Sequence, residues 1–189
     1  MPNPFQSERI ALRPFEPADL PALWDHLNHP DLAGCRYIPY QFPETAPLSQ
    51  KQVEEICARW AEEKTGFHFA IVRRDTQALI GHAEVEWDWD AHAPGFALVI
   101  APAHGRRGYG SEVLDLLLHY LFGHTPAHNV SAWFADWNEP ARHFLERHGF
   151  SEGGGMRRVG VRAGRYYDML LVDLLRPDWQ ARSGGRYAA

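Results

Sequence analysis

Apolar residues near the start of the chain alternate with polar ones and then change to a helical spacing. Ile10 and Leu12 fall on one side of the alternating segment, which predicts a strand over 8–14. Leucine and tryptophan then recur at spacings of three and four residues, and a proline stands at the beginning of this stretch. The pattern predicts an amphipathic helix over 17–28, because such spacing lines up apolar side chains along one face.

A proline-rich segment and a second helix follow. Residues 29–48 include four prolines, too many for a long helix, so we expect a loop with one short helical piece. Ser49 and Gln52 have the spacing of a capping box, in which each side chain accepts the other residue's backbone N–H at a helix start. Apolar residues at helical spacing continue from there, which predicts a second helix over 49–64.

The middle of the chain has strand-like segments and then a helix. The runs 67–73, 79–89 and 95–101 are separated by turn-like residues, which predicts an antiparallel meander. A glycine-rich loop follows the third strand, and four leucines at helical spacing then predict a helix over 111–122. The loop therefore connects the end of a strand directly to the beginning of a helix.

The last third of the chain is predicted to hold three strands and a short helix. Asn138 is a favourable N-cap, and Gly149 is placed to end the helix that follows it. Residues 163–164 suit the turn of a hairpin. No linker or internal repeat divides the sequence, so we expect one domain over 1–181 and a disordered tail over 182–189. The predicted strands cover 129–137, 159–162 and 166–174.

The composition is that of an ordinary globular protein, and it excludes several classes of partner. Hydrophobic residues make up 45% of the chain and charged residues 23%, which argues against disorder. A net charge of −5 lacks the basic footprint of a nucleic-acid-binding protein. The best apolar stretch, 113–122, is too short to span a membrane and contains an aspartate. Two cysteines without a paired spacing, and no secretory leader, predict a reducing, cytoplasmic location.

The glycine-rich loop carries the clearest chemical signal. Residues 105–110, Gly-Arg-Arg-Gly-Tyr-Gly, place small residues and two arginines at a helix start, where backbone N–H groups lack helical partners. Such a site binds phosphate, so the ligand should carry a phosphate or pyrophosphate. The spacing fits neither the dinucleotide fingerprint, whose third glycine would fall on Val113, nor a P-loop. A tight turn without a ligand is the alternative interpretation of the same glycines.

This loop resembles the acyl-CoA loop of the GNAT N-acetyltransferases, in which Gln or Arg is followed after two residues by Gly, one further residue, and Gly or Ala. One position differs, since Gly105 stands where the family has glutamine or arginine. The resemblance extends over 7–23, 138–150 and 164–179, which are similar to successive blocks of the RimJ/RimL-like branch. It implies an α/β (α+β) fold: a mixed, mostly antiparallel seven-stranded sheet with about four helices, its strands splayed at the cleft for acetyl-CoA.

The resemblance also implies which residues hold the cosubstrate, acetyl-CoA. The backbone of Val99 and Ile100 would bond the pantetheine arm, and an N–H near Ile100 would stabilise the oxyanion formed from the thioester. Asn138 matches an asparagine that contacts the same arm, although a plain N-cap explains this residue equally well. The pyrophosphate would lie on the loop residues Arg106, Arg107, Gly108, Tyr109, Gly110 and Ser111.

The implied reaction is direct attack of an amine on the acetyl thioester, but the residues that usually move the protons are missing here. The family glutamate before the loop corresponds to Gly95, its tyrosine to Leu145, and the serine of some relatives to Ala141. An acyl-CoA-binding regulatory or interaction protein without turnover therefore stays open beside an N-acetyltransferase. A nucleotide-binding domain of another class is the third alternative.

Carboxylates on the strand over 79–89 are the nearest replacements for the missing base. Alternation puts His82, Glu84 and Glu86 on one face of this strand. Glu84 or Glu86 is expected to accept the amine proton directly or through a water molecule, since clustering raises carboxyl pKa values toward neutrality. A polar face exposed to solvent is the alternative.

The acceptor is expected to be a cationic amine, either a protein N-terminal α-amine or a small molecule. Aromatic rings and carboxylates both favour an ammonium group. We expect the pocket to include Trp87 and the loop aromatics Tyr37 and Tyr40, with Phe42 and Trp89 in the same set. The histidines match no metal-binding motif, so no metal is expected. Relatives of the family are often dimers, which leaves a homodimer open.

Overall fold

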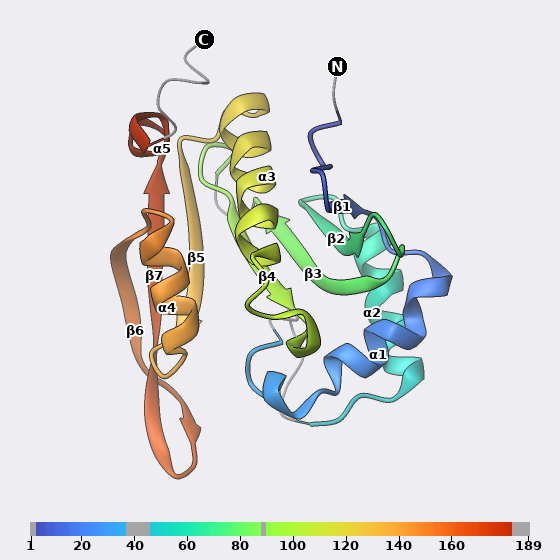
Figure 1. Ribbon diagram of the computed structural model, residues 1–189. Helices are drawn as coiled ribbons and strands as arrows, with labels where there is room; N and C mark the ends of the chain where they lie inside the picture. Colours follow the sequence, from blue (N-terminus) through green and yellow to red (C-terminus); the bar gives the residue numbers. More distant parts are fainter. Residues whose placement is uncertain (1–2, 37–45, 88–89, 183–189) are drawn as a thin grey trace. The chain divides into compact units, whose positions relative to one another are not determined.

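Strands and helices follow one another in the order that the sequence predicts, with one helix added at the end (Figure 1). The computed structural model describes residues 3–36, 46–87 and 90–182. The chain divides into two units, one made of Met1–Glu86 and Ala97–Tyr120 and the other of Trp87–Phe96 and Leu121–Ala189. Among the described residues, no helix has the length and apolar character needed to cross a membrane.

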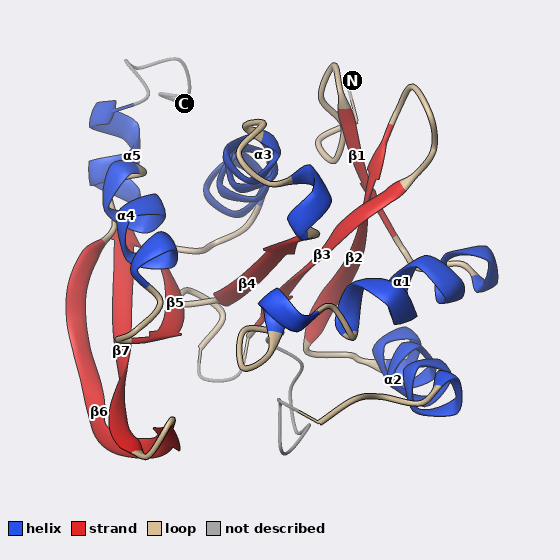
Figure 2. Cartoon of the chain, turned by 60° about the horizontal axis from the view of Figure 1, so that its bottom comes forward, coloured by secondary structure: helices blue, strands red, loops and turns tan. Residues whose placement is uncertain are grey.

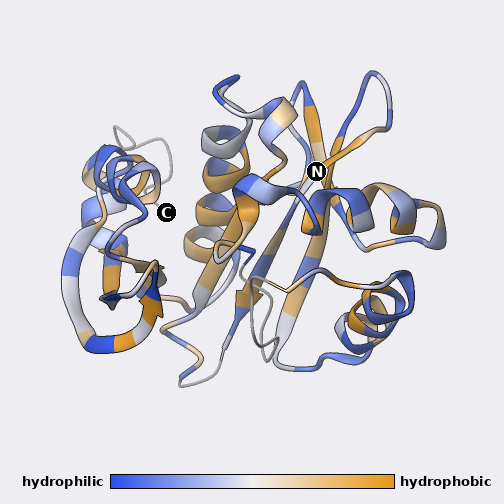
Figure 3. Cartoon of the chain, turned by 90° about the horizontal axis from the view of Figure 1, so that it is seen from below, coloured by the Kyte–Doolittle hydropathy of each residue, from blue (hydrophilic) through white to orange (hydrophobic). Residues whose placement is uncertain are grey.

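The strands of the first unit form the predicted antiparallel meander. β1 (Ile10–Arg13) pairs with β2 (Gly66–Arg73), and β2 pairs with β3 (Leu79–Glu86). β4 (Gly95–Ile100) neighbours β3, and the two arrows in Figure 1 run in opposite directions. Apolar residues, shown in orange, follow these strands in Figure 3, as the alternation in the sequence requires.

Two helices of the first unit pack side by side (Figure 2). A 3-10 turn (Pro17–Asp19) leads into α1 (Leu20–Leu27), and α2 (Gln50–Glu62) begins after the predicted capping box, in which Ser49 and Gln52 bond each other's backbone N–H. The proline-rich segment between them contains one 3-10 turn (Pro30–Leu32), as expected for its described part. Their shared core is made of Leu23, Leu27, Leu48, Val53 and Ile56.

Helix α3 (Tyr109–His124) begins two residues before its predicted start. Val113, Leu114, Leu117 and Leu118 are buried, which confirms the predicted apolar face. Leucine spacing alone could not locate the first turn, because Tyr109 and Gly110 lie before the first leucine of the pattern. The helix start is therefore closer to the glycine-rich loop than the prediction placed it.

The second unit contains β5 (Asn129–Ala135), β6 (Ser151–Arg162) and β7 (Arg165–Leu175), hydrogen-bonded in the order β5-β7-β6. β5 also pairs in parallel with the start of β4, at Ser131 and Gly95. This parallel pair makes the strand arrangement mixed and mostly antiparallel, as predicted. Helix α4 (Glu139–Arg147) follows β5, and Asn138 caps it by accepting the N–H of Ala141 at 3.2 Å.

Two predictions for the second unit are wrong. β6 begins at Ser151, not at residue 159, and forms a long hairpin with β7. Almost every residue of β6 is exposed, so its first half has no buried face to produce an alternating pattern. The short helix α5 (Arg176–Arg182) was not predicted, because two turns carry too few apolar positions to show a period.

Candidate functional site

The loop between β4 and α3 forms a cradle at the N-terminal end of a long helix. A 3-10 turn (Pro102–His104) follows β4, and α3 begins five residues later. Arg106 and Gly108 have left-handed backbone conformations, with φ angles of +58° and +84°. Glycine adopts this conformation at little cost, whereas other residues are strained there. The first N–H groups of α3 have no partner within the helix, which is the arrangement that binds phosphate.

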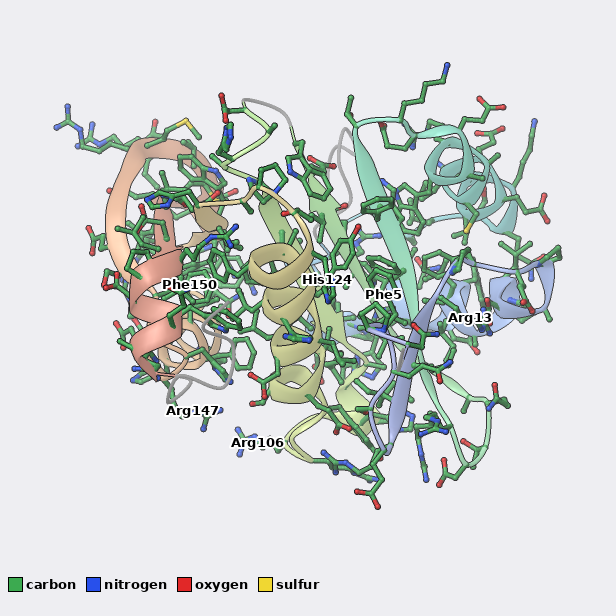
Figure 4. The ribbon with its side chains drawn as sticks, turned by 90° about the horizontal axis from the view of Figure 1, so that it is seen from above. Phe5, Arg13, Arg106, His124, Arg147 and Phe150 are labelled. Atoms are coloured by element: carbon green, nitrogen blue, oxygen red, sulfur yellow. The ribbon has the colours of Figure 1, made fainter. Side chains whose placement is uncertain are left out.

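The two arginines of this loop are exposed. Figure 4 shows Arg106 at the N-terminal end of α3, with its side chain directed away from the helix. Arg107 is exposed beside it, whereas the ring of Tyr109 is buried. Two guanidinium groups thus add positive charge next to the positive end of the helix dipole, which favours an anionic ligand.

Residues from the beginning of the chain hold this loop in place. Arg9 donates from Nε to Glu112 Oε2 at 2.8 Å and from Nη1 to the carbonyl oxygen of Arg107 at 3.2 Å. Its guanidinium carbon lies 4.9 Å from the centre of the Tyr109 ring. Ser7 donates its hydroxyl to the second oxygen of Glu112. Sequence patterns missed this contact, since Arg9 and Glu112 are 103 positions apart.

The predicted pantetheine-binding residues lie where β4 packs closely against β3. Val99 is buried and Ile100 is partly buried. The N–H of Ala101 donates to the carbonyl oxygen of Ile80 at 2.8 Å. Gly81 approaches so closely that a Cβ atom added there would overlap the carbonyl oxygen of Val99. The end of β4 is therefore fixed against its neighbour just before the loop begins.

Glu84 is buried on β3, and Glu86 is partly buried at the end of the same strand. Pairing of β2 with β3 places His68 opposite Glu84 and Gly66 opposite Glu86. His68 Nδ1 lies 3.5 Å from Glu84 Oε2, and the two side chains are only 5% and 10% exposed. The alternative of a solvent-exposed polar face is wrong for Glu84, because residues of α1 and α2 pack over this part of the sheet.

Glu84 lies on β3, the strand that neighbours β4. The bond between Ala101 and Ile80 sets the register of β3 and β4. Gly95, the family position of the missing base, belongs to the second unit, whereas Glu84 belongs to the first. Leu145, the position of the family's tyrosine, is buried in α4 and offers no proton.

Three histidines share the buried face with the carboxylates. His26 Nε2 lies 3.0 Å from His82 Nδ1, and His82 Nε2 lies 2.8 Å from the carbonyl oxygen of Arg36. Because that carbonyl only accepts, His82 donates to it and accepts from His26. Burial lowers the pKa of His68 and of His82 to about 4, and burial together with His82 lowers the pKa of His26 to about 2. All three imidazoles are therefore neutral at pH 7.

Two pockets of the first unit meet at Trp60 and His68. The rings of these two residues stack, with centroids 5.0 Å apart and an interplanar angle of 13°. A pocket of about 250 Å³ is lined mainly by apolar residues, including Phe15, Leu20 and Cys57. A second pocket of about 410 Å³ is charged. Besides Trp60 and His68, its lining residues are Arg59, Glu62, Glu63, Lys64 and Glu86.

The geometry of this cluster suits a positively charged ligand. One side-chain atom of each residue, a ring nitrogen of His68 and a carboxylate oxygen of Glu84 and of Glu86, lies within 4.8 Å of the other two. Two carboxylates and a neutral imidazole can accept hydrogen bonds from an ammonium group, and the ring of Trp60 adds a favourable face. A histidine with two carboxylates is also a ligand set for divalent transition metals, although the chain has no metal-binding motif.

Sequence reasoning identified part of this cluster. Glu84 and Glu86 were predicted from the alternation of β3, and the structure brings them together with His68 and Trp60, which were missed. A correct register for β2 and β3 would have indicated His68. The predicted role of the aromatic residues stays a prediction: Trp87 belongs to the second unit, and Tyr37, Tyr40, Phe42 and Trp89 lie outside the described residues.

Asn138 has the simpler of its two predicted roles in the structure. Its side chain accepts the backbone N–H of Ala141, so the N-cap interpretation is confirmed. The contact with a pantetheine arm stays a prediction. Both roles are compatible, because the amide of Asn138 has donors besides the oxygen that caps α4.

This chain is similar to known proteins over nearly its whole length. The model of a family described as the acetyltransferase (GNAT) domain matches residues 9–151. A relative from Bacillus subtilis, called uncharacterized N-acetyltransferase YoaA, is 26% identical over 91% of this chain and 96% of its own. The spermidine N(1)-acetyltransferase of Vibrio cholerae is 26% identical over 94% of this chain and 99% of its own. The match covers nearly the whole of each protein.

Solved structures share the fold. A GNAT-family acetyltransferase from Bacillus anthracis superimposes with a TM-score of 0.77 at 20% identity, covering 92% of this chain and 98% of its own. The spermidine/spermine N-acetyltransferase SpeG from Vibrio cholerae, solved with manganese ions, gives a TM-score of 0.71 at 25% identity, over 93% of this chain and 97% of its own.

Proposed function

Because the chain belongs to the GNAT acetyltransferase family, we propose that it transfers the acetyl group of acetyl-CoA to a small, positively charged primary amine. Its family and its relatives named N-acetyltransferases make the chain an acyltransferase. The observation that carries the finer proposal is the cluster of His68, Glu84 and Glu86, in which Glu84 is buried and the other two are partly buried at a pocket; it offers two carboxylates and a neutral imidazole to a cation.

The loop before α3 fits the pyrophosphate of acetyl-CoA. The residues 106–111 combine a helix N-terminus, two exposed arginines and Gly108, whose missing Cβ leaves the backbone accessible. The backbone of Val99 and Ile100 would bond the pantetheine arm, with Asn138 as a further contact. The N–H of Ile100 would donate to the thioester oxygen as negative charge develops on it. Acetyl-CoA supplies the activated acyl group.

The amine must lose a proton before it can attack. An α-amino group with a pKa near 8 is about one tenth neutral at pH 7, and a lysine-like amine with a pKa near 10.4 is far less so. Glu84 accepts this proton directly or through a water molecule and passes it to solvent. The neutral nitrogen then attacks the thioester carbon, and the C–S bond breaks. Of the two protons left on the nitrogen, one is transferred to the departing sulfur, which gives free CoA, and the other stays on the amide.

The pocket lined by Trp60, His68 and Glu86 supports a small cationic acceptor. Its volume of about 410 Å³ is in the range of small-molecule sites. The spermidine N(1)-acetyltransferase of Vibrio cholerae, a relative at 26% identity, supports the same substrate class. The resemblance to the RimJ/RimL-like branch supports a protein N-terminal α-amine instead, and this is the second candidate acceptor.

Thermal unfolding with and without acetyl-CoA tests the cosubstrate, with ATP and NAD as controls. A ligand at 100 times its Kd should stabilise the fold by about 2.7 kcal/mol, which raises the unfolding temperature by several degrees. We expect this shift with acetyl-CoA and not with the two controls. A shift with ATP or NAD, or no shift, would reject the assignment of the loop.

Release of free thiol from acetyl-CoA then tests the acceptor. Amines of matched pKa, with and without a second positive charge, should be compared with a peptide bearing a free N-terminus. We expect the dication to be preferred. Preference for the peptide would favour the second candidate, whereas binding of acetyl-CoA without thiol release from any amine would indicate a binding protein that lacks turnover.

A further inference from the structure

The first turn of α3 contains a carboxylate at a place where phosphate is expected to bind. Glu112 is in the first turn of the helix, four residues after Gly108. A negative side chain there stabilises the helix, but it also uses part of the positive potential that an anionic ligand needs. Phosphate binding at this helix therefore requires that the charge of Glu112 be balanced by another group.

Arg9 and Ser7 provide that balance. Glu112 Oε2 accepts from Arg9 Nη2 at 2.6 Å and from Nε at 2.8 Å, and Ser7 donates to Oε1. Both carboxylate oxygens are thus engaged on the side of the helix that faces the start of the chain. The Glu112 side chain is 18% exposed and that of Arg9 is 49% exposed, so solvent screens this pair only in part.

The same guanidinium group also contacts the loop itself. Arg9 Nη1 donates to the carbonyl oxygen of Arg107, which is the residue before Gly108. This bond occupies a backbone acceptor of the loop. The guanidinium group lies over the ring of Tyr109 as well. The side chain of Arg9 therefore contacts Arg107, Tyr109 and Glu112, all in or next to the expected phosphate-binding loop.

We propose that Arg9 is a positioning residue for the acetyl-CoA loop: it neutralises Glu112 and fixes the carbonyl of Arg107, so that the helix N-terminus is available to the pyrophosphate. This inference rests on the proposed function of the loop. It explains how a helix that carries a first-turn carboxylate can bind an anion, and it assigns a role in binding to the segment before β1.

A double-mutant cycle measured by titration calorimetry with CoA tests the proposal. Arg9→Ala should weaken the affinity about fivefold to tenfold, because Glu112 then repels the anion. Glu112→Gln alone should leave the affinity unchanged or slightly higher. The double variant Arg9→Ala with Glu112→Gln should recover to within about threefold of the wild type. Arg9→Lys, which keeps the charge but not the forked geometry, should fall between Arg9→Ala and the wild type.

A matched control uses Arg74, which also contacts the start of the chain but not Glu112. Its Nη1 donates to the carbonyl oxygen of Ser7 at 2.6 Å. Arg74→Ala should leave CoA affinity unchanged. If it weakens binding as much as Arg9→Ala does, loosening of the segment is the cause and the proposal is overturned. The maximal rate at saturating acetyl-CoA should change less than the KM in Arg9→Ala, since Arg9 acts on binding.

The outcomes separate this inference from the proposed function. A wild-type protein that does not bind CoA would reject the function of the loop, and the role of Arg9 with it. Binding by the wild type that is unaffected by Arg9→Ala would reject the role of Arg9 alone. A double variant that stays as weak as Arg9→Ala would show that Arg9 contacts the nucleotide directly, which also contradicts the proposal.

Discussion

His68 and Glu84 face each other across two antiparallel strands, with 3.5 Å between Nδ1 and Oε2, in a place almost closed to solvent. The imidazole is neutral at pH 7, because burial lowers its pKa to about 4. His68 therefore does not neutralise Glu84 by carrying a positive charge. The pair of Glu84 and His68 is therefore a contact between a carboxyl group and a neutral imidazole.

Substitution of the two β3 glutamates should separate proton transfer from amine binding. Glu84→Gln should lower kcat by about 100-fold, because the amide cannot accept a proton from the amine. Glu86→Gln should mainly raise the KM of the amine, since Glu86 lines the larger pocket. Steady-state rates of thiol release, measured over a range of amine concentrations, give both constants.

Glu55→Gln is the matched control for these variants. Glu55 is exposed on α2 and forms an ion pair with Lys51, away from the pocket. Its replacement should leave kcat and KM within about twofold of the wild type. Wild-type turnover in both Glu84→Gln and Glu86→Gln would show that neither carboxylate is the base.

The stability of the protein should decrease as the pH falls below neutrality. Histidines of the unfolded chain have a pKa of 6.5, whereas those of His68 and His82 are about 4 in the folded protein. Between these values the unfolded chain binds protons that the folded protein does not, so low pH favours unfolding. Each histidine should reduce the free energy of unfolding by about 1.4 kcal/mol per pH unit in this range. Urea unfolding at pH 8, 6.5 and 5 measures the slope.

His82→Gln should reduce this pH dependence. A glutamine amide can still donate to the carbonyl of Arg36 and accept from His26, but it does not titrate. His143→Gln, at an exposed position of α4, is the control for replacing a histidine by glutamine. Equal slopes for the wild type and His82→Gln would show that the lowered pKa of His82 is not a cause of the pH dependence.

Two glycines on neighbouring strands should differ in their tolerance of a methyl group. Gly81→Ala on β3 should destabilise the fold by about 2 kcal/mol or more, because the new Cβ atom would overlap the carbonyl oxygen of Val99. Gly95→Ala on β4 should have little effect, since its nearest neighbour, Ser131 Oγ, would be 3.8 Å away. Thermal unfolding of the two variants compares them directly. A similar loss of stability in both would indicate that loss of glycine, not crowding, is responsible.

Arg176 should contribute strongly to the second unit. Its guanidinium group donates to the carbonyl oxygens of Phe122, Thr125 and Ala127, at 2.5 Å and 2.9 Å for the first two. Arg176→Ala should cost about 2 kcal/mol, because three carbonyl groups lose their donor together. Arg176→Lys should restore only part of that stability, since an ammonium group cannot reach three acceptors with the same fork. Full rescue by lysine, measured by chemical denaturation, would contradict this.

Local signals in the sequence predicted most of the fold. The capping box of Ser49 and Gln52, the N-cap at Asn138 and the leucines of α3 act over one or two helical turns, so their effect is visible in sequence. The first half of β6 was missed because a strand without a buried face needs no alternation. Its pairing with β7 depends on the hairpin as a whole, which no single segment encodes.

The candidate site could be predicted from the sequence only where its residues are neighbours along the chain. Residues 105–110 are contiguous in the sequence, so the glycines, the arginines and the approximate start of the helix were visible together. His68 joins Glu84 only through the register of β2 and β3, and a shift of one residue would turn it to the other face. Arg9 reaches the loop from the start of the chain. Contacts of this kind follow from three-dimensional packing and leave no spacing in the sequence.

The contact between Arg9 and Glu112 limits when during folding the loop can take its final shape. It joins residues separated by 103 positions, so it can form only after more than half of the protein has been synthesised. Closing so long a segment carries a large entropy cost, which grows with the logarithm of its length. We therefore expect the loop to acquire its final shape only after helix α3 and its neighbouring strands have formed, and a nascent chain that ends before Glu112 lacks the carboxylate that Arg9 binds.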